Sequence, residues 1–263
     1  MAKRSKSGGK SASKKSGSSN PALKAVIEDL VAGNRILYNE GVVDGFGHIS
    51  ARDPRDPNRF LLSRARAPGL VVAADILEFG MDGEPIKANG PPVYSERFIH
   101  SEIYKKRSDV NAVIHSHSPG VIPFSITDVP LRAVMPPAAF LHTGVPVFEI
   151  RDAAGMTDML VTNVKRGQAL AERLGNHSVA LMRGHGDVVV GSDLRLAVAR
   201  AVYTEINARI QMQAVMLAAG GRVEYMAAEE CALREANTAG HTRGSGMGQD
   251  RVWEALKSAL VDQ

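Results

Sequence analysis

The chain has 263 residues, of which 44% are hydrophobic, 23% charged and 5% aromatic, a composition typical of one large globular domain or two small ones. Its formal net charge is +4, no apolar run approaches the roughly 20 residues that span a bilayer, and no apolar core follows the basic N-terminus as in a secretory signal. The single cysteine, Cys231, excludes an internal disulfide framework and fits a reducing compartment. We therefore expect a soluble cytoplasmic protein with no membrane partner.

Residues 1–20 form a basic tail that carries six lysines and arginines and no acid. Without these six, the 32 basic residues of the chain fall to 26, against 28 acidic residues, so the remainder is close to neutral. A Ser/Gly/Lys segment lacks the apolar side chains of a core, and we predict that it is disordered. Two functions are open for this tail: it attracts nucleic acid or other anions, or it acts only as a solubilising extension. The second role is favoured because no aromatic residue is present to stack on bases.

Ordered structure is predicted to begin near Pro21, where apolar residues at helical spacing run to Gly41. The short apolar runs that follow predict six strands, at residues 59–63, 76–80, 111–117, 145–150, 177–184 and 187–192. Helical spacing between these runs predicts helices over residues 95–106, 157–174 and 193–219. Because strands and helices alternate without a strict βαβ rhythm, we expect a mixed α/β single domain with a central sheet.

The C-terminal part divides into two segments. Residues 227–250 lose the apolar periodicity of a helix or strand, whereas residues 251–261 predict a short amphipathic helix with Trp253, Leu256 and Leu260 on its apolar face. We expect this terminal helix to pack on the same subunit or on a neighbouring one.

Two histidines stand one residue apart in the segment NAVIHSHSPG, at the end of an apolar run. If residues 112–117 form a strand, its period of two places the imidazoles of His115 and His117 on the same face. Two nitrogens that converge on one point are the beginning of a metal site.

Two other segments offer further ligands. His185 stands between two glycines in the segment RGHGDVVVG, at a tight turn that lets the backbone approach a bulky group closely. The segment YSERFIHSEIYKKR predicts a helix that is capped by Ser95, with Glu96 in its first turn and His100 one turn later. Three neutral imidazoles and the Glu96 carboxylate suit one Zn²⁺, Mn²⁺, Fe²⁺ or Co²⁺ ion per subunit. A carboxylate that can leave the metal can also act as an acid or base.

Each of these residues also has a simpler interpretation. The pair His115 and His117 can be two half-buried histidines that bond to backbone carbonyls. Glu96 can be an acid that stabilises a helix dipole, and His185 can be an ordinary turn residue. His100 is expected to pack in the helix or to support a ligand rather than to bind the metal.

Taken together, these residues resemble the class II aldolase/adducin family. Four segments support the resemblance in the same order, over about residues 24–220: GFGHISARDP, YSERFIHSEIYKKRSDVNAVIHSHSP, VPVFEIRDAAG and LMRGHGDVVVG. The resemblance implies that His115, His117 and His185 form the metal triad, and that Glu96 binds the resting metal or acts as acid and base. It also implies a three-layer αβα domain with a central mixed or antiparallel sheet, and a C4 homotetramer with sites at subunit interfaces. We assign residues 21–228 to this catalytic domain and residues 229–263 to a C-terminal extension.

The chain departs from the members of the family that use sugar phosphates. Those proteins hold phosphate with small residues, whereas here His48 replaces an asparagine, Arg64 and Arg66 enter a second loop, and Tyr94 replaces a serine. A phosphate needs many N–H and O–H donors packed around it, and a tyrosine ring occupies that space. The chain also has no tyrosine between residues 104 and 203, where the aldolases have a proton donor. Sugar-phosphate aldolase chemistry is therefore not expected.

The pattern is most similar to a decarboxylase branch of the family, which acts on hydroxylated aromatic dicarboxylates such as dihydroxyphthalates and 3-hydroxy-2-methylpyridine-4,5-dicarboxylate. That resemblance implies a retro-aldol-like cleavage of a carbon–carbon bond that releases CO₂, with the oxyanion on the metal and Glu96 as the candidate proton carrier. Guanidinium groups pair bidentately with carboxylates. The expected substrate-binding residues are Arg64, Arg66, Ser63, His48, Ser95 and, less directly, Arg97.

Several alternatives remain open at this point. The proton donor is Glu96, His48, His142 or a metal-bound water, and Arg64 and Arg66 can instead be a solvated strand end. The same metal set would support an aldolase or epimerase that acts on an unphosphorylated hydroxy-carbonyl compound, or an Fe(II)-dependent oxygenase. An adducin-like interaction module without a metal is the alternative that is not an enzyme.

Overall fold

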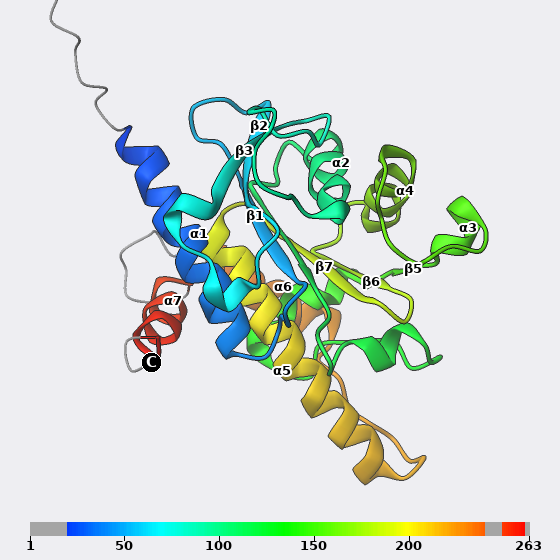
Figure 1. The fold of residues 1–263 in the computed structure, drawn as a ribbon. Coiled ribbons are helices and arrows are strands. Elements are labelled where there is room, and N and C mark those ends of the chain that lie inside the picture. Colours follow the sequence, from blue (N-terminus) through cyan, green and yellow to red (C-terminus); the bar gives the residue numbers. More distant parts are fainter. Residues whose placement is uncertain (1–19, 240–248, 261–263) are drawn as a thin grey trace, which may run out of the picture.

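The computed structural model describes residues 20–239 and 249–260 and is built around a seven-stranded sheet (Figure 1). The order of the strands in the sheet is β3-β2-β1-β4-β7-β6-β5. All neighbouring strands are antiparallel except β5 and β6, which are parallel, so the sheet is mixed. The strands are β1 (His48–Arg52), β2 (Arg59–Ser63), β3 (Ile76–Gly80), β4 (Ala112–Ser116), β5 (Val147–Phe148), β6 (Val179–Met182) and β7 (Gly186–Gly191).

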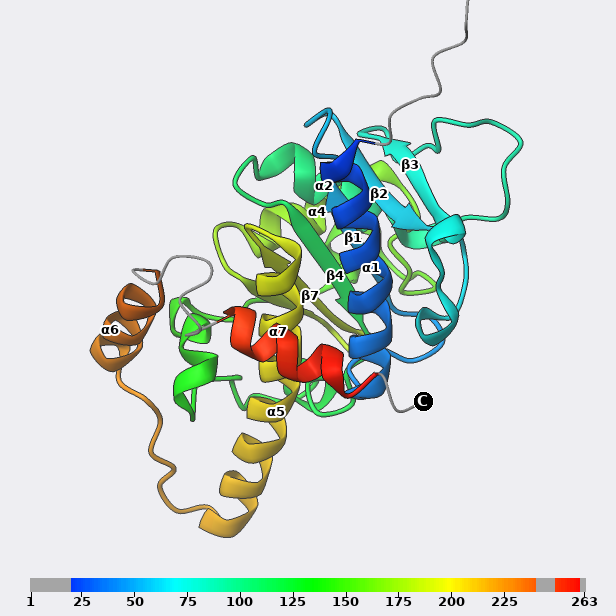
Figure 2. The ribbon, with the colours of Figure 1, turned by 90° about the vertical axis from the view of Figure 1, so that its left-hand side faces the viewer.

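Helices cover both faces of this sheet. The α-helices are α1 (Pro21–Asn39), α2 (Phe98–Lys106), α3 (Ile150–Ala154), α4 (Val164–Leu174), α5 (Leu194–Ala218), α6 (Ala228–Ala239) and α7 (Gln249–Ser258). Short 3-10 helices are η1 (Pro68–Leu70), η2 (Ala73–Asp75), η3 (Ser95–Arg97), η4 (Ile122–Ser125) and η5 (Pro136–Thr143). Figure 2 shows α1, α5 and α7 in front of the sheet, with α2 and α4 on its other side.

The alternation of side chains along β4 explains the three layers. Ile114 packs into an apolar cluster with residues of α1 and α5, whereas its neighbour Val113 packs into a second cluster with Ile99 of α2 and Leu170 of α4. Successive residues of a strand point to opposite faces, so an almost wholly apolar strand supplies both cores at once. The predicted three-layer αβα domain is therefore confirmed.

The strands predicted over residues 59–63 and 76–80 are present with these bounds, but other predictions were wrong. The strand β1 was missed because only Ile49 and Ala51 give it an apolar alternation, although it pairs with β2 and β4 in the middle of the sheet. The predicted strand at residues 145–150 is reduced to two residues of β5, because α3 begins at Ile150.

Two helix predictions also need correction. The helix predicted over residues 157–174 begins only at Val164, because the side chain of Asn163 accepts a hydrogen bond from the Arg166 N–H and caps it. Residues 227–250 were expected to lack regular structure, yet Ala228–Ala239 form α6. This helix packs against η5, and Cys231 is its buried apolar side chain, so it gives little apolar periodicity.

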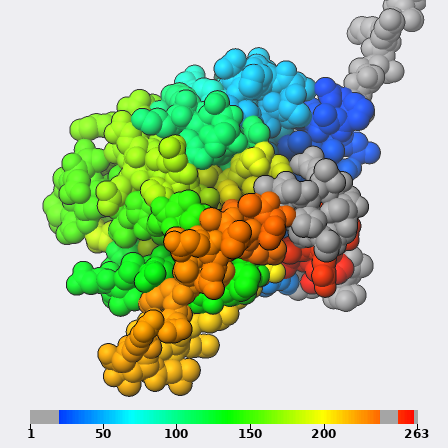
Figure 3. Space-filling model, turned by 180° about the vertical axis from the view of Figure 1, so that it is seen from behind, coloured from blue at the N-terminus to red at the C-terminus, as the bar shows by residue number. Residues whose placement is uncertain are grey.

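The terminal helix α7 packs against α1 and α5 of the same chain. Trp253 is 3% exposed, and the guanidinium carbon of Arg195 lies 5.3 Å from the centre of its ring. Figure 3 shows α6 lying across the surface of the body, with the C-terminal part of α5 projecting beyond it. The disorder predicted for the basic tail concerns residues 1–20, of which 1–19 lie outside the described residues. The last one, Asn20, is described and caps α1, since its side chain accepts hydrogen bonds from the N–H groups of Ala22 and Leu23. Within the described ranges, no helix combines the length and the apolar character that crossing a membrane requires.

Candidate metal centre

Four side chains from three separate segments meet at one end of the sheet. His115 lies on β4, His117 follows that strand, His185 lies in the turn between β6 and β7, and Glu96 lies in η3. One ligand atom from each of the four lies within 4.8 Å of the other three. The ring centroids of the three imidazoles are 5.1, 4.9 and 5.0 Å apart. The structure thus brings together the four residues that the sequence analysis selected as metal ligands.

The turn that carries His185 fits closely against β4. A Cβ atom placed on Gly186 would lie 1.8 Å from the carbonyl oxygen of Ser116, so only glycine is compatible with this approach. Gly184 adopts a φ of +61°, a conformation that glycine adopts at no steric cost. The two glycines therefore allow the His185 imidazole to reach the histidines of the neighbouring strand.

Hydrogen bonds fix the ring orientation of two histidines. The Nδ1–H of His115 donates to the backbone carbonyl of Asp187 at 3.0 Å, and the Nδ1–H of His117 donates to a carboxylate oxygen of Asp44 at 3.1 Å. In the neutral form of each ring, the other nitrogen, Nε2, therefore carries the lone pair that can bind a metal. These two Nε2 atoms are buried and have no hydrogen-bond partner among the described residues, and His185 turns its own Nε2 toward Glu96 beside them. Buried polar atoms are nearly always satisfied, so this convergence indicates a missing ligand.

Glu96 divides its two carboxylate oxygens between the protein and the cluster. Oε1 accepts a hydrogen bond from the Val161 N–H at 2.7 Å. Oε2 lies 3.6 Å from the Nε2 atoms of both His115 and His185. The backbone of Glu96, in the middle of η3, is not helical, with φ −90° and ψ 16°.

Burial and the neighbouring charges shift the pKa values of the cluster. Burial raises the pKa of Glu96, but the contact with His115 and the charges of His115 and His185 outweigh it and lower the pKa to about 2. Burial and the charge of His115 lower the pKa of His185 to about 4. Burial opposes protonation of His115, but its contact with Glu96 outweighs this and raises the pKa. Glu96 is therefore ionised and His185 neutral near pH 7, the states in which both groups bind a cation.

The donor set fits a divalent metal ion. Three imidazole nitrogens and one carboxylate suit Zn²⁺, Mn²⁺, Fe²⁺ or Co²⁺. The Glu96 oxygen completes the group, and the Asp44 carboxylate stands behind His117 as an outer partner. The cluster is therefore a candidate metal centre.

A chain of buried hydrogen bonds continues from the cluster into the core. The ring of His48 lies 5.1 Å from that of His115, and its Nδ1 atom is 2.7 Å from Nε2 of His100. His100 then contacts the hydroxyl of Ser50, which contacts the hydroxyl of Tyr104. Burial and the charges of other histidines lower the pKa of His48, and burial and the charge of His115 lower the pKa of His100 to about 3. Both histidines are therefore neutral, and His100 stands behind His48 and is not part of the four-residue cluster.

The two arginines of the predicted substrate loop share one carboxylate. Arg64 donates through Nε to Asp75 at 2.6 Å, and Arg66 donates through Nη1 to the same group at 3.0 Å. Tyr94 ties this loop to the cluster, because its hydroxyl donates to the backbone carbonyl of Arg66 and its ring lies 4.6 Å from that of His48. Asp75 thus fixes one nitrogen of each guanidinium in place.

The remaining predicted substrate contacts have different environments. Ser63 is 1% exposed, and its hydroxyl lies 3.3 Å from that of Tyr94. Ser95 is exposed and does not cap the helix: the N-cap of η3 is Tyr94, which provides no side-chain hydrogen bond, so the predicted Ser95 cap was wrong. Arg97 donates hydrogen bonds to the carbonyl of Gly83 and to the carboxylate of Glu84, which follow β3.

Three features of the site were missed in the sequence. The Asp44 carboxylate accepts hydrogen bonds from the backbone N–H groups of Phe46 and Gly47 as well as from His117. The Asp-x-x-Gly spacing is a recognisable turn signal, but nothing local connects it to His117. Phe46 is 73% exposed beside this histidine, with ring centroids 6.4 Å apart.

The third missed feature is the buried acid Glu205 of α5. Its carboxylate accepts hydrogen bonds from the hydroxyl of Ser118 and from the Gly120 N–H, and it pairs with Arg209. The segment after His117 is therefore anchored to a helix that is almost ninety residues further along the chain. No local sequence signal predicts this contact.

Comparison with known proteins identifies the family. The model of the Class II Aldolase and Adducin N-terminal domain matches residues 28–212, so the chain belongs to this family. The decarboxylase tropJ of Talaromyces stipitatus is 38% identical over 206 residues, which cover 73% of this chain and 77% of that protein. A 3,4-dihydroxyphthalate decarboxylase of Arthrobacter keyseri is 29% identical over 205 residues, which cover 72% of this chain and 78% of that protein. The resemblance to the family and to its decarboxylase branch is thereby confirmed.

Solved structures show the same fold. An aldolase II superfamily protein from Pseudomonas syringae has a TM-score of 0.75 at 23% identity, with 92% of this chain and 94% of that chain covered. L-fuculose 1-phosphate aldolase from Glaciozyma antarctica has a TM-score of 0.73 at 23% identity, with 94% and 96% covered. At this level of sequence identity the structural similarity supports the fold alone. The reaction has to be inferred from the residues of the site.

Proposed function

We propose that the protein is a metal-dependent carboxy-lyase that removes CO₂ from a hydroxylated aromatic or pyridine dicarboxylate. The observation that carries the proposal is the convergence of three imidazoles and Glu96, in which the buried Nε2 atoms of His115 and His117 have no hydrogen-bond partner among the described residues. The similarity to a decarboxylase and to a dihydroxyphthalate decarboxylase supports the reaction class. The arginines of the neighbouring loop support a substrate that carries carboxylates.

His115, His117 and His185 would hold the ion, with Glu96 as a fourth ligand or as a partner that leaves it. A divalent ion there, for which we propose Mn²⁺ or Zn²⁺, would supply Lewis acidity to a substrate hydroxyl oxygen. Loss of CO₂ from the adjacent ring carbon leaves an electron pair on the ring, and that carbon must then receive a proton. Glu96, which is ionised near neutral pH, would accept the proton of the substrate hydroxyl as the oxyanion forms and return it to the ring carbon after CO₂ has left. It suits this role because Val161 holds one of its oxygens and leaves the other facing the cluster.

The substrate carboxylates would be bound by Arg64 and Arg66. Asp75 uses one nitrogen of each guanidinium and holds both side chains in an ordered position, so the remaining N–H groups can pair with a carboxylate at little entropic cost. His48 lies between this loop and His115 and would contact the ring substituents. The exposed ring of Phe46 would pack against the aromatic ring of the substrate.

The experiment that tests the proposal combines metal analysis with an assay of CO₂ release. Purified wild type, loaded in turn with Mn²⁺ and Zn²⁺, is incubated with dihydroxyphthalates and hydroxypyridine dicarboxylates. We expect about one metal per chain and CO₂ release without O₂ uptake, with both lost in His117→Ala. The matched control is His142→Ala, which removes an exposed histidine of η5 and should retain the metal. Release of an aldehyde would establish an aldolase, and O₂ uptake an oxygenase. Absence of metal from wild type would leave an adducin-like scaffold.

We further propose that the chain forms a homo-oligomer, as in the C4 tetramer expected from the resemblance, in the cytoplasm. The projecting end of α5 supports self-association, because Met216 is 73% exposed and Leu217 is 87% exposed. Light scattering coupled to size-exclusion chromatography should give the mass of four chains for wild type. A lower mass is expected for Leu217→Ser, whereas a monomeric wild type would contradict the proposal.

A further inference from the structure

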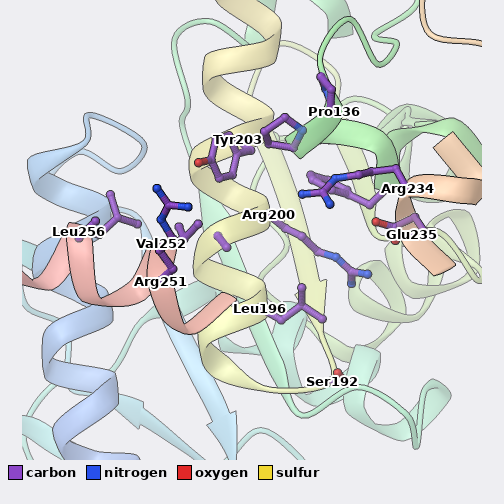
Figure 4. A pocket seen from close by; sticks show the side chains of 14 residues that line it. Pro136, Ser192, Leu196, Arg200, Tyr203, Arg234, Glu235, Arg251, Val252 and Leu256 are labelled. Carbon is purple, nitrogen blue, oxygen red and sulfur yellow. The ribbon is translucent and has the colours of Figure 1, made fainter. Parts of the chain in front are cut away.

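A second candidate site lies on the opposite face of the sheet from the metal centre. A cavity of about 650 Å³ opens between η5, α5, α6 and α7 (Figure 4). None of the four residues of the metal cluster lines it. The helix α5 packs on the face of β4 that carries Ile114, whereas His115 points to the face of Val113. A ligand in this cavity would therefore be separated from the metal centre by the sheet.

The charges around the cavity are predominantly positive. Arg200 of α5, Arg234 of α6 and Arg251 of α7 all line it, against one acid, Glu235. Figure 4 shows these side chains around the N-terminal half of α5, with Arg200 and Arg234 on one side of the helix and Arg251 on the other. Three different helices thus bring guanidinium groups to one space, which raises the positive potential there.

Arg200 has one buried nitrogen without a hydrogen-bond partner among the described residues. This nitrogen is Nε, whereas Nη1 donates to the carbonyl of Val190 at 2.8 Å. Burial lowers the pKa of Arg200, while the charge of Glu235, which also lines the cavity, opposes this shift. A buried N–H group without an acceptor is costly, and a carboxylate bound in the cavity would supply that acceptor.

Most of the remaining lining is apolar, apart from Ser192 and the hydroxyl of Tyr203. Phe140 lies with its ring 5.5 Å from the guanidinium carbon of Arg200, and Leu196, Val252 and Leu256 complete the wall. A small inorganic anion would leave this wall in contact with water. An organic anion with an apolar body would instead bury it while its charged end pairs with the guanidinium groups.

We propose that this cavity binds an organic carboxylate with an apolar, ring-sized body, at a site distinct from the metal centre. Its volume lies within the range of about 300–1,000 Å³ that is usual for small-molecule sites. The binding does not depend on the reaction proposed for the metal centre, so each proposal can fail without the other.

Benzoate is a suitable probe, because it has one carboxylate on a ring and no hydroxyl with which to chelate a metal. Trp253, the only tryptophan of the chain, is buried on α7 next to Val252, so its fluorescence should report binding in the cavity. We expect saturable quenching or enhancement of this fluorescence when benzoate is added to the full-length, metal-loaded protein. We expect weaker binding of inorganic phosphate.

The variants Arg251→Gln and Arg200→Gln should each weaken benzoate binding at least about tenfold. Arg251 is exposed, so its substitution tests the site even if Arg200→Gln fails to fold. Arg222→Gln is the matched control, because this side chain is 84% exposed, pairs with Glu224 and does not line the cavity. The proposal is overturned if benzoate gives no saturable signal, or if its affinity survives in Arg251→Gln. It is also overturned if affinity is lost in Arg64→Gln alone, or if phosphate binds more tightly than benzoate.

Discussion

The metal centre and the arginine cavity lie on opposite faces of one sheet, and both contain buried nitrogens without a hydrogen-bond partner. At the metal centre, His115 and His117 use Nδ1–H to donate to oxygen, so in the neutral rings each Nε2, which has no partner in the part of the chain that the structure describes, carries a lone pair. In the cavity, the Nε of Arg200, which also has no partner there, carries a proton. The first arrangement fits a cation and the second fits an anion. The protonation of a buried nitrogen, rather than its burial, therefore indicates the class of ligand.

The largest expected effect concerns Glu96, which carries the only negative charge among the four residues of the metal cluster. Its replacement should affect the metal centre and leave the arginine cavity unchanged. The change Glu96→Gln keeps an acceptor for the Val161 N–H but removes the charge and the ability to carry a proton. We expect kcat to fall by about 10²–10⁴-fold while three histidines still retain part of the metal. Steady-state kinetics and metal analysis measure these two effects separately. Full activity in the variant would remove Glu96 as the proton carrier, and benzoate binding should be unchanged.

Glu205 provides a second test of this comparison. It lies on the same helix as Arg200, but its carboxylate binds the segment that follows His117 of the metal cluster. The change Glu205→Ala leaves the Ser118 hydroxyl and the Gly120 N–H without their acceptor. We expect the free energy of unfolding to fall by about 3 kcal/mol. Urea denaturation measures this loss. The control Glu205→Gln retains an acceptor and should lose less, and equal losses in the two variants would contradict the proposed cause.

The next prediction concerns Asp44, the outer partner of the metal centre, whose carboxylate accepts a hydrogen bond from His117. The change Asp44→Asn preserves an oxygen for the Phe46 and Gly47 N–H groups but removes the carboxylate that accepts from His117. We expect the affinity for the metal to fall by about 10–100-fold, because an outer carboxylate orients the ring and raises its basicity. Competition with a chelator measures this affinity. The exposed residue Asp128 supplies the control, and Asp128→Asn should bind metal like wild type.

The smallest expected effect concerns Phe46, whose exposed ring lies beside His117. Removing the ring in Phe46→Ala should raise KM for an aromatic dicarboxylate by about 3–10-fold, since an aromatic contact contributes about 0.5–1.5 kcal/mol. The conservative variant Phe46→Tyr should restore most of the affinity. Kinetics over a range of substrate concentrations separate KM from kcat, and an unchanged KM in Phe46→Ala would exclude the contact.

Much of the fold follows from local patterns. The strands at residues 59–63 and 76–80 and the long helix that begins after Asp193 were predicted with nearly correct bounds, because strong periodicity and a capping side chain mark them. β1 and α6 were not predicted, because each is held by partners distant in sequence. Ile49 and Ala51 alone do not specify a strand, but pairing with β2 and β4 does.

The candidate site also contains residues that local sequence predicts and partners that it does not predict. His115, His117, His185 and Glu96 stand in short motifs whose spacing suggests their chemistry, so the ligand set could be proposed from the sequence. The partners of these residues could not. Asp44 reaches His117 from 73 positions away, and Asp75 joins Arg64 to Arg66 through a turn whose path depends on the packing of its surroundings.

The sequence by itself determined the alternation of helices and strands, the four clustered residues and the family to which the chain belongs. The tertiary structure alone decided which strands are neighbours, and therefore that His48 lies opposite His115 and that β7 brings the turn of His185 beside β4. It also decided that α5, α6 and α7 enclose a cavity with three arginines. The physical reason is that local propensity depends on a few adjacent residues, whereas strand pairing and helix packing depend on the apolar surface that the whole chain buries at once.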